Sequence, residues 1–144
     1  MQLSGRKITC LILIIVSLTC FTACPAITDW EYKLPNNYKV VHINIDDIHL
    51  SKERPSGNGG DAIVGRFILE FCNNDRYVGV KRVSDEGYDS FDIDEADLTK
   101  LEYYIVDTLE DAVYGPFTEE EYNEQLSVLQ INDLGDWIKT SDVN

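Results

Sequence analysis

The sequence predicts an α+β domain, in which an antiparallel β-sheet of about five strands carries a C-terminal helix packed on one face. Short runs of alternating apolar and polar residues come in pairs joined by turn residues, which is the pattern of β-hairpins. Thr118 is followed three residues later by Glu121, which is the capping box that begins a helix. A chain of this length buries roughly two thirds of its unfolded surface, so the fold needs no disulfide or metal.

The first part of the domain predicts one strand pair and a loop. Residues 32–38 predict a turn, because proline presets φ and the two asparagines tolerate the left-handed region. Residues 39–45 predict a strand, and residues 48–50 resume the pairing. Residues 51–61 are rich in glycine and proline and predict a mobile loop.

The middle of the domain predicts a hairpin. Residues 62–72 form the clearest strand pattern, in which Phe71 and Cys72 point to opposite faces. Residues 73–75 predict a tight turn, and residues 77–83 return as a strand.

A second hairpin and a helix follow. The hairpin is predicted from residues 103–107 and 112–116. Acidic residues at 119–121 favour the positive end of the helix dipole. Phe117 and Tyr122 have the spacing of a hydrophobic staple. Tyr122, Leu126 and Leu129 repeat at helical spacing, which predicts that this helix packs on the sheet. Trp137 and Ile138 are expected to fold back and cover a sheet edge.

The N-terminus has the order of an export signal. Arg6 and Lys7 precede an apolar run from Ile8 to Leu18, which has the length of a signal core and is short for a membrane span. Phe21-Thr22-Ala23-Cys24 resembles the lipobox of bacterial lipoproteins, with phenylalanine where leucine is usual. The sequence therefore predicts a signal peptide over 1–23, a lipid-anchored tether over 24–31 and one globular domain over 32–144.

Lipidation at Cys24 would determine where in the cell the protein is located. Two or more acyl chains hold a domain stably at a bilayer, so we expect it at the extracytoplasmic face of the cell membrane. Two alternatives remain open. The segment Ile8–Ile27 acts as an uncleaved span, or another peptidase cuts near Ala26 and releases a soluble protein.

The remaining cysteine and the charge limit the partners. Cys10 and Cys20 leave with the signal and Cys24 is modified, so Cys72 is left without a disulfide partner in the chain. We expect a packed, inert thiol there; an intermolecular disulfide or a reactive thiol is the alternative. From Cys24 onward 10 basic residues face 26 acidic ones, a net charge of −16, which speaks against a nucleic-acid partner and permits a protein or basic peptide.

With the elements placed, the chain resembles a small family of bacterial lipoproteins whose domain has no assigned function. The opening YKLPNNY (32–38) is similar to the family's LPxGY, with Asn37 where glycine is usual. The stretch YYIVDTLEDAVYGPFTEEEYNEQL (103–126) resembles its closing motif of the form IIDT…VYGPFTEEEF. The resemblance implies a lipoprotein with one compact domain, and it implies no catalytic or ligand-binding residue.

The candidate sites are weak. His42 and His49 have an odd separation, which puts them on opposite faces of a single strand, and zinc needs more nitrogen or sulfur ligands than these. In the acidic stretch 84–97, Asp92 and Asp94 have the alternate spacing of a calcium loop. Ala96 stands where a third ligand is needed, so an EF-hand is excluded, and a weak divalent-cation site stays an alternative to a solvated acidic face.

The predicted function is a non-catalytic, lipid-anchored binding domain with no cofactor. No serine nucleophile lies in an elbow motif, so no catalytic residue is assigned. An envelope hydrolase that uses a carboxylate pair is the alternative, and 26 acidic residues make that pattern unspecific.

Overall fold

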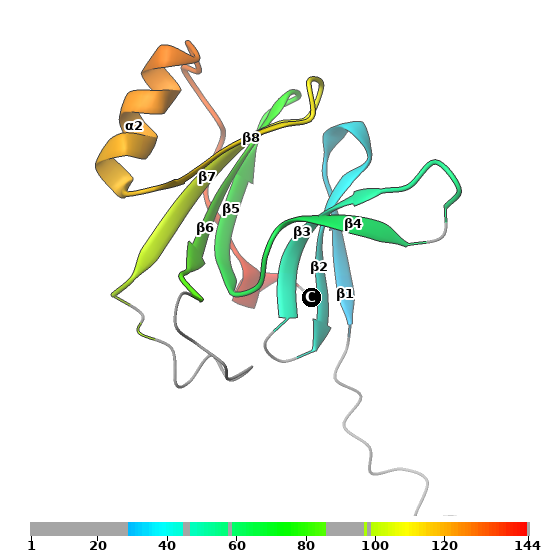
Figure 1. Ribbon diagram of the computed structural model, residues 1–144. Helices are drawn as coiled ribbons and strands as arrows, with labels where there is room; N and C mark the ends of the chain where they lie inside the picture. The colour runs from blue at the N-terminus through cyan, green and yellow to red at the C-terminus, as the bar shows by residue number, and fades with distance from the viewer. Residues whose placement is uncertain (1–28, 45–46, 58, 86–96, 98, 144) are drawn as a thin grey trace, which may run out of the picture.

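The protein folds into two antiparallel sheets and one helix (Figure 1), as a computed structural model shows. The structure describes residues 29–44, 47–57, 59–85, 97 and 99–143. The four-stranded sheet has the order β1-β2-β3-β4, with β1 Trp30–Lys33, β2 Tyr38–Asn44, β3 Asp47–Glu53 and β4 Gly60–Val64. The five-stranded sheet has the order β8-β7-β6-β5-β9, with β5 Ile68–Asn73, β6 Tyr77–Val83, β7 Leu101–Asp107, β8 Ala112–Phe117 and β9 Ile138–Lys139.

The predicted antiparallel architecture with a C-terminal helix is confirmed, and a second sheet is added to it. The helix α2 (Glu119–Val128) lies against β7 and β8 of the five-stranded sheet. Its capping box is present: the Thr118 hydroxyl accepts the backbone N–H of Glu121 at 3.3 Å, and the Glu121 carboxylate accepts that of Thr118 at 2.8 Å. Ile138 of β9 pairs with Phe71 of β5, so the expected covering of a sheet edge is also confirmed.

The strand predicted over 62–72 is wrong as a single element. The chain leaves the four-stranded sheet after Val64 and enters the five-stranded sheet at Ile68. Phe67, between them, has a φ of 66° and a buried side chain, and its carbonyl accepts the N–H of Val83. A continuous apolar pattern therefore hides a sharp turn between two sheets. The predicted loop 51–61 is also shorter than expected, because β3 continues to Glu53 and β4 begins at Gly60.

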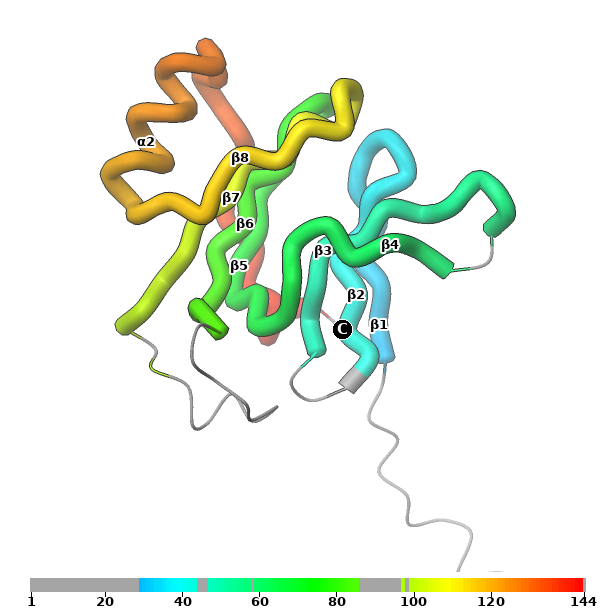
Figure 2. The backbone as a smooth tube through the Cα atoms, in the orientation of Figure 1, coloured from blue at the N-terminus to red at the C-terminus, as the bar shows by residue number. Residues whose placement is uncertain are grey.

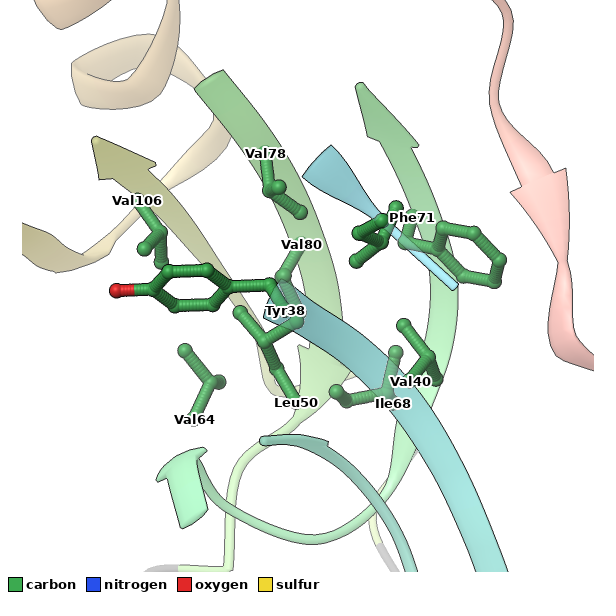
Figure 3. Close-up of a cluster of buried hydrophobic side chains, with 10 residues drawn as sticks. Tyr38, Val40, Leu50, Val64, Ile68, Phe71, Val78, Val80 and Val106 are labelled. Carbon is green, nitrogen blue, oxygen red and sulfur yellow. The ribbon is translucent and has the colours of Figure 1, made fainter. Parts of the chain in front are cut away.

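The main core lies between the two sheets. Figure 3 shows side chains of the four-stranded sheet, among them Val40, Leu50 and Val64, in one cluster with Phe71 and Val80 of the five-stranded sheet. These five side chains are at most 2% exposed. A bulge between Ile68 and Glu70 turns Ile68 into the same cluster.

A second cluster fills the other face of the five-stranded sheet. Cys72, Tyr103 and Ile105 lie on the sheet, and Tyr122 of α2 packs over them together with Leu134. The five-stranded sheet is therefore the middle layer, with the four-stranded sheet on one side and the helix on the other (Figures 1 and 2).

The segments before Asp29 and most of the acidic stretch lie outside the described residues. The predicted signal 1–23, Cys24 and Asp92 and Asp94 of the acidic stretch all belong to these parts. The first strand of the described part, β1, begins at Trp30, within the range 24–31 predicted as a tether. Within the described ranges, no helix has the length and hydropathy needed to cross a bilayer.

Candidate functional site

Three turns meet at one end of the molecule. They are the 3₁₀ turn η1 (Pro35–Asn37) after β1, the turn between β5 and β6, and the turn between β7 and β8 (Figures 1 and 2). Polar side chains join these turns to one another and to β3. We name this group the tip cluster, and it consists of Asn36, Tyr38, Lys52, Arg76, Asp107, Thr108 and Asp111.

Asn36 joins all three turns. Its backbone is in the left-handed region, with φ 58° and ψ 36°, which asparagine tolerates better than most residues. Its side-chain amide donates to the Thr108 hydroxyl at 2.8 Å and to the carbonyl of Asp75 at 3.3 Å. The Thr108 hydroxyl donates in turn to the carbonyl of Arg76 at 2.5 Å. The turn of the four-stranded sheet is therefore hydrogen-bonded to two turns of the other sheet.

Asp107 holds the turn between β7 and β8. Its buried carboxylate accepts from Arg76 Nε at 3.0 Å and from Nη2 at 2.6 Å, and it also accepts the backbone N–H groups of Leu109 and Glu110. The hydrogen bonds from Arg76 are the main reason that the pKa of Asp107 lies below its usual value, and the two backbone donors add to this effect.

Asp111 connects the tip to the four-stranded sheet. Its Oδ1 accepts from the Tyr38 hydroxyl at 2.9 Å and from Lys52 Nζ at 2.5 Å, and the Lys52 ammonium lies 5.5 Å from the centre of the Tyr38 ring. The pKa of Asp111 is lowered, first by Lys52 and then by Tyr38. Burial raises the pKa of Tyr38, and the hydrogen bond to Asp111 raises it further, so the phenol stays protonated as a donor.

The lowered pKa values of Asp107 and Asp111 suit ion pairs that hold the turns together better than they suit general-acid catalysis. A carboxyl group that acts as a general acid near neutral pH needs a raised pKa. Every described carboxyl group whose pKa is shifted has it shifted downward; these groups are Asp61, Asp85, Asp97, Glu102, Asp107, Asp111 and Glu121.

Two hollows open beside the tip cluster. The first has a volume of about 600 Å³ and is lined by residues of the β3–β4 hairpin, among them Lys52, Arg54 and Asp61. The second, of about 410 Å³, lies along η1 and is lined by residues that include Lys33 and Lys39. Asn37 and Glu53 line both hollows. We name the two together the tip trough.

The two histidines do not lie on one strand, and they do not share a face of the sheet. His42 lies on β2 and His49 on β3, and the pairs His42↔Ile48 and Val41↔His49 put them on opposite faces of the sheet. The ring of His42 stacks on Trp30 with a centroid distance of 5.4 Å. Nδ1 of His49 lies 2.9 Å from Asp47 Oδ1. No group of three or more potential metal-ligating side chains was found among the residues that the structure describes.

Cys72 is packed beneath the helix. The residue is 1% exposed, and burial raises the pKa of its thiol to about 11. Tyr122 packs in the same cluster. A thiol with such a pKa holds little thiolate at neutral pH, and this agrees with the packed, inert group expected from the sequence.

Comparison with known proteins gives a family. Residues 35–136 match the family described as "Protein of unknown function (DUF3997)". The chain belongs to this family. No curated protein and no solved structure gave a significant match.

The DUF3997 match contains the whole tip cluster. It begins at Pro35 in η1 and continues beyond α2, so most of the opening motif and all of the closing motif lie inside it. Sequence reasoning singled out both motifs without predicting that Asn36 of the first would meet Thr108 of the second. It missed Lys52 entirely, because that residue lies in the stretch predicted as a loop.

Proposed function

We propose that this DUF3997 domain belongs to an exported bacterial lipoprotein, is held by a lipid on Cys24 at the extracytoplasmic face of the cell membrane, and binds a protein or peptide there without catalysis. The basic head, apolar run and lipobox-like Phe21-Thr22-Ala23-Cys24 support the anchor.

The placement of the tip carries the proposal. Trp30, where β1 begins, is six residues after Cys24, so a lipid on that cysteine keeps the start of β1 close to the bilayer. Figure 1 shows that the three turns of the tip lie at the opposite end of the sheets from the start of β1. The tip trough then faces away from the membrane, where a partner in the envelope can reach it.

The charge selects among partners. A net charge of −16 after the signal repels nucleic acid and other polyanions, and it attracts partners with basic groups. In this proposal the tip cluster keeps the binding surface rigid, because its ion pairs and hydrogen bonds between the sheets hold the walls of the trough in place.

In-cell photo-crosslinking of the full chain tests the proposal. A photoreactive residue at Pro55, which lines the trough, should yield a specific adduct with an envelope protein or peptide. The same residue at Glu124, which is exposed on α2, is the matched control and should not yield that adduct. Repeated absence of an adduct from Pro55, or the same adducts from both positions, contradicts a binding surface at the tip.

A further inference from the structure

Two lysines face each other on the solvent side of the four-stranded sheet. Lys33 on β1 lies directly opposite Lys39 on β2. Like charges at opposite positions destabilise a pair of strands. Glu31 accepts Lys39 Nζ at 2.8 Å, whereas no side chain in the described part of the protein pairs with the Lys33 ammonium. The lysine pair therefore has one carboxylate for two cations, and both lysines line the tip trough.

Glu53 presents the opposite charge in the same trough. It is the only residue of β3 that lines both hollows, and its strand partner is Gly60, which offers no cation. Neighbouring cations are already paired, Lys52 with Asp111 and Arg54 with Asp61. Among the described residues, the Glu53 carboxylate has no ion-pair partner.

We infer that the tip trough binds a peptide segment that carries one carboxylate and one cation, with the carboxylate between Lys33 and Lys39 and the cation at Glu53. This rests on the proposed binding function and names its ligand chemistry. A carboxylate ligand relieves the repulsion of the lysine pair, and a cationic group pairs with Glu53.

The distribution of charge supports a ligand with both signs. Four of the 10 basic residues that follow the signal line the trough, namely Lys33, Lys39, Lys52 and Arg54, although the chain as a whole is strongly acidic. Three acidic residues, Glu31, Glu53 and Asp61, also line the trough, so its lining is close to neutral within a negative field. That field repels a purely anionic ligand, whereas a dipolar peptide gains at both ends.

Sheet geometry sets the spacing of the two groups. Lys33 and Glu53 are two strands apart and offset by about two residues along the strands, which places their Cα atoms about 12 Å apart. An extended peptide spans that distance in about four residues, and an even separation keeps both side chains on the same face. The probe is therefore acetyl-Ala-Lys-Ala-Ala-Ala-Glu-Ala-amide, whose blocked ends leave two charges.

A charge cycle on the full lipidated chain in nanodiscs tests the inference. Binding is measured by NMR titration at low salt, with probes in which glutamine replaces the lysine, the glutamate or both. Glu53→Gln should weaken the affinity for the probe with both charges by about three- to five-fold, as expected for an exposed ion pair. It should also abolish the preference for lysine over glutamine in the probe. Lys33→Gln should abolish the preference for glutamate in the same way.

Glu124→Gln on α2 is the matched control, because it removes the same charge from an exposed site outside the trough. The inference is overturned if this control weakens binding as much as Glu53→Gln, if neither trough variant changes the charge preference, or if no probe binds at about 10 mM. A tip-specific photo-adduct from Pro55 combined with any of these results leaves the binding function in place and removes only the dipolar ligand.

Discussion

Asp107 stabilises the tip through four donors, so its loss is expected to be costly. Asp107→Asn removes the charge that pairs with Arg76 and leaves an amide N–H₂ against donors. We expect the free energy of unfolding at pH 7 to fall by about 2 kcal/mol, the size found for hydrogen bonds to charged groups. Urea unfolding measures this loss. Glu110→Gln is the control, because the side chain of Glu110 is exposed, and it should change stability little.

The lowered pKa of Asp107 also predicts how the stability of the parent protein and that of Asp107→Asn differ in their dependence on pH. A carboxyl group with a lower pKa in the folded state stabilises the fold above its unfolded pKa of about 3.9, and this contribution is lost as the pH falls through the folded value. The parent protein should therefore lose stability on acidification below about pH 4, and Asp107→Asn should lose less. Parallel stability curves for the two proteins would contradict this role.

Burial of Cys72 predicts a protected thiol. Its pKa of about 11 and its place beneath Tyr122 leave little thiolate and no access for reagents. Iodoacetamide at pH 8 should alkylate Cys72 only after unfolding in urea, as peptide mass spectrometry can measure. Rapid alkylation in the native protein, or a Cys72-linked dimer on a non-reducing gel, would support the reactive alternative.

At the scale of elements, the helix and the sheet approach closely at Gly79. A Cβ placed there would lie 2.5 Å from the Tyr122 hydroxyl and 2.7 Å from Cys72 Sγ. Gly79→Ala should therefore destabilise the protein by about 1–3 kcal/mol through overpacking. Tyr122→Phe removes the clashing oxygen, so the double variant should lose less stability than the sum of the two single variants. Additive losses in thermal unfolding would show that Tyr122 is not the obstacle.

Elements with a local signal were predicted well. The hairpin of β7 and β8 and the cap at Thr118 depend on neighbouring residues, and the sequence contains all of them. The division of 62–72 between β4 and β5 depends instead on Phe67, which takes a positive φ that bulky residues rarely adopt. The distant contact that holds it, from Val83 to the Phe67 carbonyl, has no counterpart in a local pattern.

At the scale of the whole molecule, a single sheet was expected because hairpin patterns do not say which hairpins share a sheet. The apolar residues of β2 and β3 suit a half-buried strand whether they pair with β5 or pack face to face against it. The tip cluster was beyond prediction for the same reason, since Asn36 and Thr108 are 72 residues apart in the chain. The residues around Cys24 are a different case, because an export signal is recognised as a linear sequence.

The anchor predicts the form of the whole protein in the cell. Of the four cysteines in the chain, only Cys24 follows Thr-Ala at the end of an apolar run of signal length. Cys24→Ser should abolish acylation and therefore cleavage by the lipoprotein-specific peptidase, so the precursor should accumulate or be released by a cut near Ala26. Cys20→Ser is the matched control and should change little. Mass spectrometry of the membrane-extracted protein should find an N-terminus at Cys24 with two or more acyl chains. A native N-terminus at Met1, or an unlipidated one at Ile27 in the medium, would remove the anchor and with it the outward orientation of the tip.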